Sequence, residues 1–234
     1  MAECNIALVE LDETIISNDE LQMIKAVTFS EVKEFFEGQG VTFIGTTAEK
    51  NTIIKKGSLT LSGNTVSIMD TQIQLFSTDI IESEKINGFI FDEKGHLLGI
   101  VREEDYNMSE NSISFATLNS IRMYIDCFVG NYLVPYIGIY GKEVTEDVIN
   151  NIDSQMPFGI YISKIKKDSP AYNVGIVNGD VVISINNKEV KNFSDYSEEL
   201  KKCSNGQQVM VAVMRKGKEG YKRIEYQITV GGLD

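Results

Sequence analysis

The chain has 234 residues, of which 42% are hydrophobic and 24% are charged, proportions typical of a globular protein with a buried core. Its formal net charge is −12, which argues against nucleic acid as a partner because nucleic-acid binding needs basic patches. No segment approaches the roughly 18 unbroken apolar residues of a membrane span. We therefore expect no nucleic-acid partner and no membrane contact within this chain.

The charge is unevenly distributed along the chain. Residues 136–234 hold 13 basic and 13 acidic side chains, so the whole acidic excess lies upstream of that range. Such a shift in composition favours a domain boundary. The cysteines Cys4, Cys127 and Cys203 are far apart in the sequence, and His96 lies in a turn-like Lys-Gly-His segment. This pattern favours isolated thiols and a surface imidazole over a disulfide or metal site, and we expect no cofactor.

Short apolar segments dominate the first half. Turn signals such as Ser62-Gly63-Asn64 separate them, and many short strands with turns between them indicate a sandwich or barrel. An amphipathic helix is predicted over 118–129, ended by Gly130. Apolar spacing also predicts a helix over 31–36, and we expect strands over 4–11, 41–45, 53–54, 57–61, 65–69, 73–76, 88–91, 97–101 and 113–116.

The second half follows a linker over 131–135. Ser169 to Gly175 predicts a one-turn helix, with Pro170 at its first position and a glycine beyond its end. A longer helix over 194–203 would have Ser194 as its N-cap. A short helix is expected over 146–152, and strands are expected over 136–144, 159–165, 180–185, 208–215 and 224–230. We therefore predict two domains, 1–130 and 131–234.

The stretch that opens the second domain suits the capture of a peptide C-terminus. Such a ligand is an anion at the end of an extended chain, so it needs converging backbone N–H groups, a free sheet edge and an apolar pocket. Gly138 lets the backbone curl to supply the amides. Tyr196 and Leu200, one helical turn apart, could form the opposite wall or could simply pack in the core. The expected peptide-binding residues are Tyr136, Ile137, Gly138, Ile139, Tyr140, Tyr196 and Leu200.

These residues resemble a known family. Tyr136 to Ile139 is similar to the carboxylate-binding loop of the PDZ domain that follows the protease in HtrA-family proteins. Asp168 to Ala171 and the segment 179–186 are similar to the most distinctive stretch of that domain. The resemblance covers the second half in the right order. It implies an α+β PDZ domain that binds peptide C-termini or exposed hydrophobic tails. We expect Asp180 to stabilise a turn rather than to carry chemistry.

The first half resembles the trypsin-like protease of the same family. The segment 5–11 is similar to the strand after the catalytic Asp, with Asn5 in the place of that Asp. Counting from both sides of the nucleophile segment puts the serine position at Ile86 or Asn87. The resemblance implies a mainly β, partial chymotrypsin fold, with the end of a first barrel followed by a trypsin-like second barrel. It places the catalytic His upstream of residue 1.

A serine-protease triad needs a nucleophile, a base and an orienting carboxylate. Asn5, Ile86 and Asn87 supply none of these groups, so we expect a degenerate barrel without catalytic residues. A different register, in which Ser83 serves as nucleophile, is the alternative.

Three functions stay open. The first is a peptide-binding pseudoprotease in extracytoplasmic protein quality control or regulation. The second is a fragment of an active HtrA-type serine endopeptidase. The third is a regulatory subunit that forms a homo-oligomer or joins HtrA-like paralogues. For all three, the resemblance implies a bacterial, extracytoplasmic protein, anchored to the membrane through a segment outside this chain.

Overall fold

A computed structural model describes residues 16–29, 35–101 and 112–233. The chain divides into two compact units. The described part of the barrel unit comprises 16–29, 35–66, 73–101 and 112–122. The described part of the second, here called the C-terminal unit, comprises Ser67–Gln72 and 123–233. The predicted strand over 4–11, which includes Asn5, lies outside the described residues, as does most of the predicted helix over 31–36.

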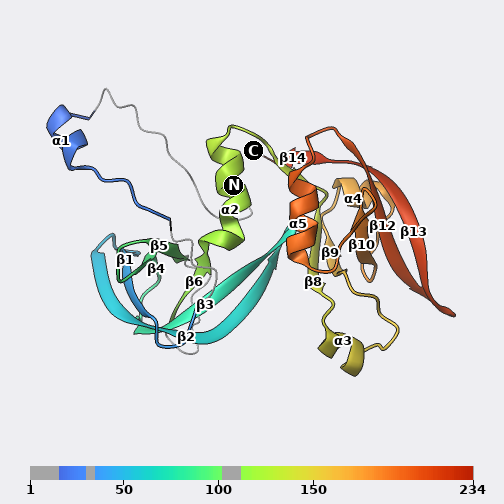
Figure 1. The fold of residues 1–234 in the computed structure, drawn as a ribbon, viewed down its shortest axis with the longest axis horizontal. Coiled ribbons are helices and arrows are strands. Elements are labelled where there is room, and N and C mark those ends of the chain that lie inside the picture. Colours follow the sequence, from blue (N-terminus) through green and yellow to red (C-terminus); the bar gives the residue numbers. More distant parts are fainter. Residues whose placement is uncertain (1–15, 30–34, 102–111, 234) are drawn as a thin grey trace. The chain divides into compact units, whose positions relative to one another are not determined.

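Six strands of the barrel unit close into a barrel in the order β1-β2-β3-β6-β5-β4 (Figure 1). Side chains alternate between the two faces of these strands, so that Val41, Phe43, Ile90 and Phe115 meet in a buried core. This confirms the predicted mainly β barrel. The elements in this half are α1 (Asn18–Met23), β1 (Gly40–Thr47), β2 (Thr52–Ile68), β3 (Thr71–Ile81), β4 (Ile86–Asp92), β5 (Leu97–Val101), β6 (Ser112–Thr117) and α2 (Leu118–Val129).

Strand β2 differs from its prediction. The sequence predicted three short strands and a turn at 62–64, whereas β2 runs unbroken through 17 residues. Strand β2 pairs with β1 over residues 52–58, and β3 is its hydrogen-bonded neighbour on the other side. Pairing along neighbouring strands thus overrides the local turn preference of Ser, Gly and Asn. Strand β2 then meets β3 through Met69 and Asp70, at the tip of a long hairpin.

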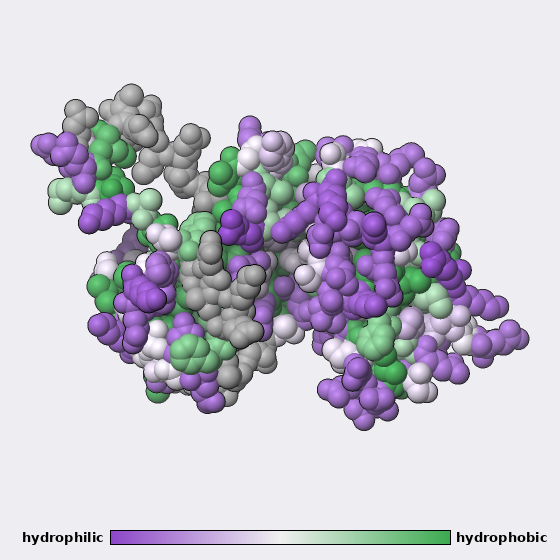
Figure 2. Space-filling model, in the orientation of Figure 1, coloured by the Kyte–Doolittle hydropathy of each residue, from purple (hydrophilic) through white to green (hydrophobic). Residues whose placement is uncertain are grey.

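The C-terminal unit holds a sheet in the order β13-β12-β10-β9-β8, with β11 paired to β10. Helix α5 lies alongside the sheet (Figure 1), and Ile160, Val182, Leu200 and Val211 are among its core residues. Polar residues cover most of the face seen in Figure 2 over β12 and β13. The elements are β7 (Val134–Tyr136), β8 (Ile139–Glu143), α3 (Glu146–Asn151), β9 (Ile160–Ile165), α4 (Pro170–Val174), β10 (Val181–Ile185), β11 (Lys188–Glu189), α5 (Phe193–Lys201), β12 (Gln208–Gly217), β13 (Gly220–Thr229) and β14 (Gly231–Leu233).

Two local predictions in this unit are wrong. The strand predicted over 136–144 is interrupted, because the backbone leaves the extended region at Gly138, whose φ is +93°. Helix α5 begins after Asn192, whose side chain accepts the amide of Asp195 at 2.8 Å. Asn caps helices as well as Ser does, so the earlier residue takes the position predicted for Ser194. The one-turn helix α4 is confirmed, with Pro170 at its start.

In the part of the chain that the structure describes, no helix has both the length and the apolar character needed to cross a membrane.

Candidate functional site

The candidate site is the loop between β7 and β8. Its central residue, Gly138, has a positive φ that residues other than glycine rarely adopt. A Cβ at this position would overlap the side chain of Ser169, the N-cap of α4. The loop is also fixed by its carbonyls: that of Ile137 accepts the amide of Ala171 at 2.8 Å, and that of Gly138 accepts the amide of Lys166 at 2.9 Å. The loop amides are therefore held in place by the chain around α4.

A carboxylate already occupies this loop. Asp70, at the tip of the β2–β3 hairpin, lies in the C-terminal unit and is 1% exposed. Its Oδ2 accepts the amides of Ile137 at 2.9 Å and Gly138 at 2.7 Å. Its Oδ1 accepts the amide of Ile139 at 3.2 Å and the hydroxyl of Tyr196, from α5, at 2.5 Å. Four donors thus converge on one carboxyl group.

Burial sets the protonation of this cluster. Loss of solvent raises the pKa of Asp70 to about 6, against the opposing effect of the hydrogen bonds from Tyr196 and the three loop amides. Burial, followed by the nearby Asp70 carboxyl, raises the pKa of Tyr196 well above 10. Tyr196 therefore keeps its proton at neutral pH and acts as a hydrogen-bond donor.

The hairpin tip also lies along β8. The amide of Asp70 donates to the carbonyl of Ile139 at 2.7 Å, and the amide of Gly141 donates to the Ser67 hydroxyl at 3.0 Å. Ser67 is thus opposite Gly141 and Asp70 opposite Ile139, so the segment runs antiparallel to β8. Because β8 is the last strand of its sheet, the tip uses hydrogen-bonding groups that an edge strand would otherwise offer to a ligand.

The structure brings together four of the seven residues predicted to bind peptide: Ile137, Gly138, Ile139 and Tyr196 surround the Asp70 carboxylate. The other three lie around this cluster. Leu200 is fully buried in the core of the C-terminal unit. Tyr136 and Tyr140 are partly buried, with the ammonium groups of Lys166 and Lys164 over their rings at 5.9 and 5.1 Å. Peptide binding by these residues stays a prediction.

Sequence reasoning missed Asp70. The residue has a φ of +57°, a left-handed conformation that Asp tolerates better than most residues. Its position in a turn could therefore have been predicted from the sequence. Its contact with Gly138, 68 positions later, could not have been predicted in this way.

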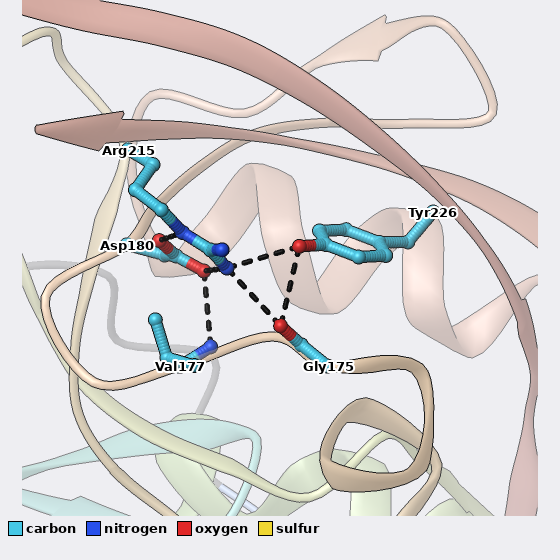
Figure 3. A network of polar contacts seen from close by, with 5 residues as sticks. All are labelled: Gly175, Val177, Asp180, Arg215 and Tyr226. Carbon is cyan, nitrogen blue, oxygen red and sulfur yellow. Dashed lines mark hydrogen bonds and ion pairs between the residues drawn. The ribbon is translucent and has the colours of Figure 1, made fainter. Parts of the chain in front are cut away.

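A second polar cluster surrounds Asp180 (Figure 3). Arg215 of β12 donates to both carboxylate oxygens of Asp180, each at 2.7 Å. Asp180 also accepts the amide of Val177 at 3.0 Å, while Arg215 donates to the carbonyl of Gly175 and to the hydroxyl of Tyr226. These contacts hold the turn that joins α4 to β10 in place against strands β12 and β13. Asp180 therefore has the turn-stabilising role expected from the sequence.

The predicted nucleophile positions lie at the start of β4. Ile86 is fully buried in the barrel core, and Asn87, the next residue, points the opposite way and is exposed. Ser83 is exposed in the connection between β3 and β4. His96, the one histidine in the sequence, contacts Asp92 through Nδ1 at 2.9 Å in the β4–β5 turn. Ile86 and Asn87 have no hydroxyl or thiol group for acyl transfer.

Comparison with known proteins agrees with this architecture. A PDZ domain model matches residues 135–225. The chain is 23% identical over 218 residues to a probable periplasmic serine endoprotease, DegP-like, of Pseudomonas putida, covering 90% of this chain and 44% of the relative. It is 25% identical over 237 residues to the serine protease Do-like HtrA of Bacillus subtilis, covering 94% of this chain and 52% of the relative. The chain thus spans about half the length of these curated relatives.

Two solved structures share the fold. The HtrA-type protease AlgW with tripeptide superposes with a TM-score of 0.57 and 18% identity, covering 88% of this chain and 69% of that one. The serine endoprotease from Yersinia pestis gives a TM-score of 0.53 and 20% identity, covering 89% and 67%. Residues 135–225 thus match a PDZ domain, and over most of its length the chain is similar in sequence and fold to HtrA-type serine proteases, with a six-stranded barrel followed by the PDZ domain.

Proposed function

We propose that the loop from Tyr136 to Tyr140 captures the terminal carboxylate of an extended peptide, which then pairs with the edge of β8. The observation that supports this proposal is the set of four donors around the Asp70 carboxylate. Because Gly138 and Ser169 fix the loop, its amides point at the anion without further rearrangement of the backbone. Recognition of a carboxylate by backbone amides, with strand addition beside it, is the PDZ mode of peptide binding.

The chemistry of the loop favours a carboxylate over other ligands. Three backbone amides and a phenolic hydroxyl donate hydrogen bonds and accept none in this arrangement. Hydrogen bonds to an ionised acceptor are roughly twice as strong as those between neutral groups. A peptide with a free C-terminus therefore has a clear advantage over the same peptide with a C-terminal amide.

We also propose that the barrel does not hydrolyse peptide bonds. Ile86 and Asn87, the two positions at which the sequence predicts the nucleophile, lack a group that can be acylated. Incubation of the chain with casein and with a serine-directed fluorophosphonate probe tests this point. We expect no cleavage and no labelling, and a labelled serine in the barrel would instead favour the endopeptidase alternative.

The names of the relatives support an extracytoplasmic place of action, since several are described as periplasmic proteases. We propose the same compartment and a part in protein quality control for this chain. Membrane anchoring and assembly with itself or with paralogues stay predictions; sedimentation of the full-length protein and co-purification with a paralogue would test them.

The experiment for peptide capture compares two fluorescein-labelled pools of decapeptides. Both pools end in Val, Leu, Ile or Phe, and they differ only in a free or an amidated C-terminus. Loss of the charge-assisted hydrogen bonds at roughly 1.5–3 kcal/mol predicts at least about tenfold weaker binding of the amidated pool in fluorescence anisotropy. Equal binding of the two pools, both by the chain and by an Asp70→Ala variant that lacks the carboxylate now in the loop, would refute carboxylate capture.

A further inference from the structure

The geometry points to Asp70 as an internal ligand that competes with external peptides: the hairpin tip from Ser67 to Asp70 occupies the carboxylate-binding loop, and a peptide must displace it. This inference rests on the proposed function of the loop. The access of peptides to the loop is regulated within the molecule, because the same chain supplies both the binding loop and its competitor.

The two ligands exclude each other because they need the same donors. Each backbone amide has a single hydrogen, and Asp70 accepts from the amides of Ile137, Gly138 and Ile139 at 2.7–3.2 Å. A second carboxylate in this loop would therefore find every amide taken. It would also lie against the Asp70 carboxylate, and two like charges at this distance repel strongly in a buried site.

The competition extends from the loop along the strand edge. The carbonyl of Ile139 accepts the amide of Asp70, and the amide of Gly141 donates to the hydroxyl of Ser67. These are the first positions at which an added strand would pair with β8. Because the tip runs antiparallel to β8 with its carboxylate in the loop, it imitates the end of a bound peptide, with a side-chain carboxylate in place of the terminal one.

An internal ligand is effective even when its intrinsic affinity is weak. A tethered group competes at an effective concentration in the millimolar range. If its intrinsic dissociation constant is about ten times lower than that concentration, the loop is open in roughly one molecule in ten, and the apparent affinity for peptide falls by the same factor. Removal of the Asp70 carboxylate should therefore increase the apparent affinity for peptide about tenfold.

The test uses the whole chain, with anisotropy of the free-acid peptide pool as the readout. Asp70→Ala removes the internal carboxylate, and Ser67→Ala removes only the contact with Gly141, so it perturbs the fold least. Asp79→Asn is the matched control, because this carboxylate of β3 accepts an amide within the barrel unit, that of Ser58. Circular dichroism and thermal unfolding check the fold of each variant.

We expect Asp70→Ala to bind the free-acid pool about tenfold tighter than the parent chain, Ser67→Ala to bind two- to threefold tighter, and Asp79→Asn to bind like the parent. If the parent chain prefers free-acid peptides and neither the Asp70 nor the Ser67 variant binds them more tightly, internal competition is refuted while the proposed function stands. If neither the parent nor any variant prefers a free C-terminus, both proposals fall. If Asp70→Ala does not fold, the result for Ser67→Ala decides.

Discussion

The carboxyl group of Asp70 should titrate far from its ordinary range. Its pKa is about 6 in the buried site, against an ordinary value of 3.8. Between these two values the docked carboxyl holds a proton that a released carboxyl lacks. Docking is therefore strongest below pH 3.8, weakens as the pH rises to about 6, and is constant above that. A difference of roughly two pKa units corresponds to about 3 kcal/mol.

The groups around Asp70 do not share this pH window. Tyr196 of α5 stays protonated because burial raises its pKa well above 10. Burial likewise raises the pKa of Cys203 above its ordinary 9.0. Tyr124 of α2 donates its hydroxyl to the Met69 carbonyl at 3.3 Å. The C-terminus of a peptide free in solution titrates at roughly 3.3–3.7.

Two measurements test the raised pKa of Asp70 in the buried site. Carbon-13 NMR of labelled aspartate should show one carboxyl resonance with a pKa of about 6, absent in Asp70→Asn. Saturation with a free-acid peptide should return that pKa toward 3.8. An Asp70 pKa below 4 in the unliganded chain would contradict this account of the buried site.

Three further changes test the local structure. Gly138→Ala should destabilise the C-terminal unit by about 2 kcal/mol in urea, because the positive φ and the overlap with Ser169 both disfavour a side chain, and unchanged stability would refute the loop geometry. Arg215→Ala should cost about 2–3 kcal/mol by leaving a buried carboxylate unpaired, a value reduced because the guanidinium is one-third exposed; Arg215→Lys should recover only part of it. Asn192→Ala should lower the free energy of unfolding by about 1 kcal/mol, because it removes the N-cap of α5. Ser194→Ala should change it by no more than about 0.5 kcal/mol. A larger loss for Ser194→Ala than for Asn192→Ala would favour Ser194 as the N-cap, as predicted from the sequence.

The elements that the sequence predicted well have their signals within a few residues. Ser169, Pro170 and Gly175 mark the start and end of α4, and each takes the predicted position. The 12-residue helix α2 follows its apolar spacing to both ends. The errors arose where neighbouring strands decide: the turn predicted at 62–64 lies within the 17-residue strand β2, which pairs with β1 over residues 52–58 and has β3 as its other neighbour. Turn preferences of single residues are weaker than a continuous ladder of hydrogen bonds.

The sequence by itself determined the loop. The order Tyr136-Ile137-Gly138-Ile139 contains the glycine that lets the backbone turn. The nearby α4 segment, which holds the loop in place, can also be predicted from the sequence, because both depend on short-range properties of the chain. Only the tertiary structure decided what occupies the loop. Asp70 reaches the Gly138 amide from 68 positions away, through a hairpin whose length and register depend on pairing across the sheet. No local preference encodes such a contact, so a loop that the sequence presents as a free binding site is, in the folded chain, already filled by one of its own carboxylates.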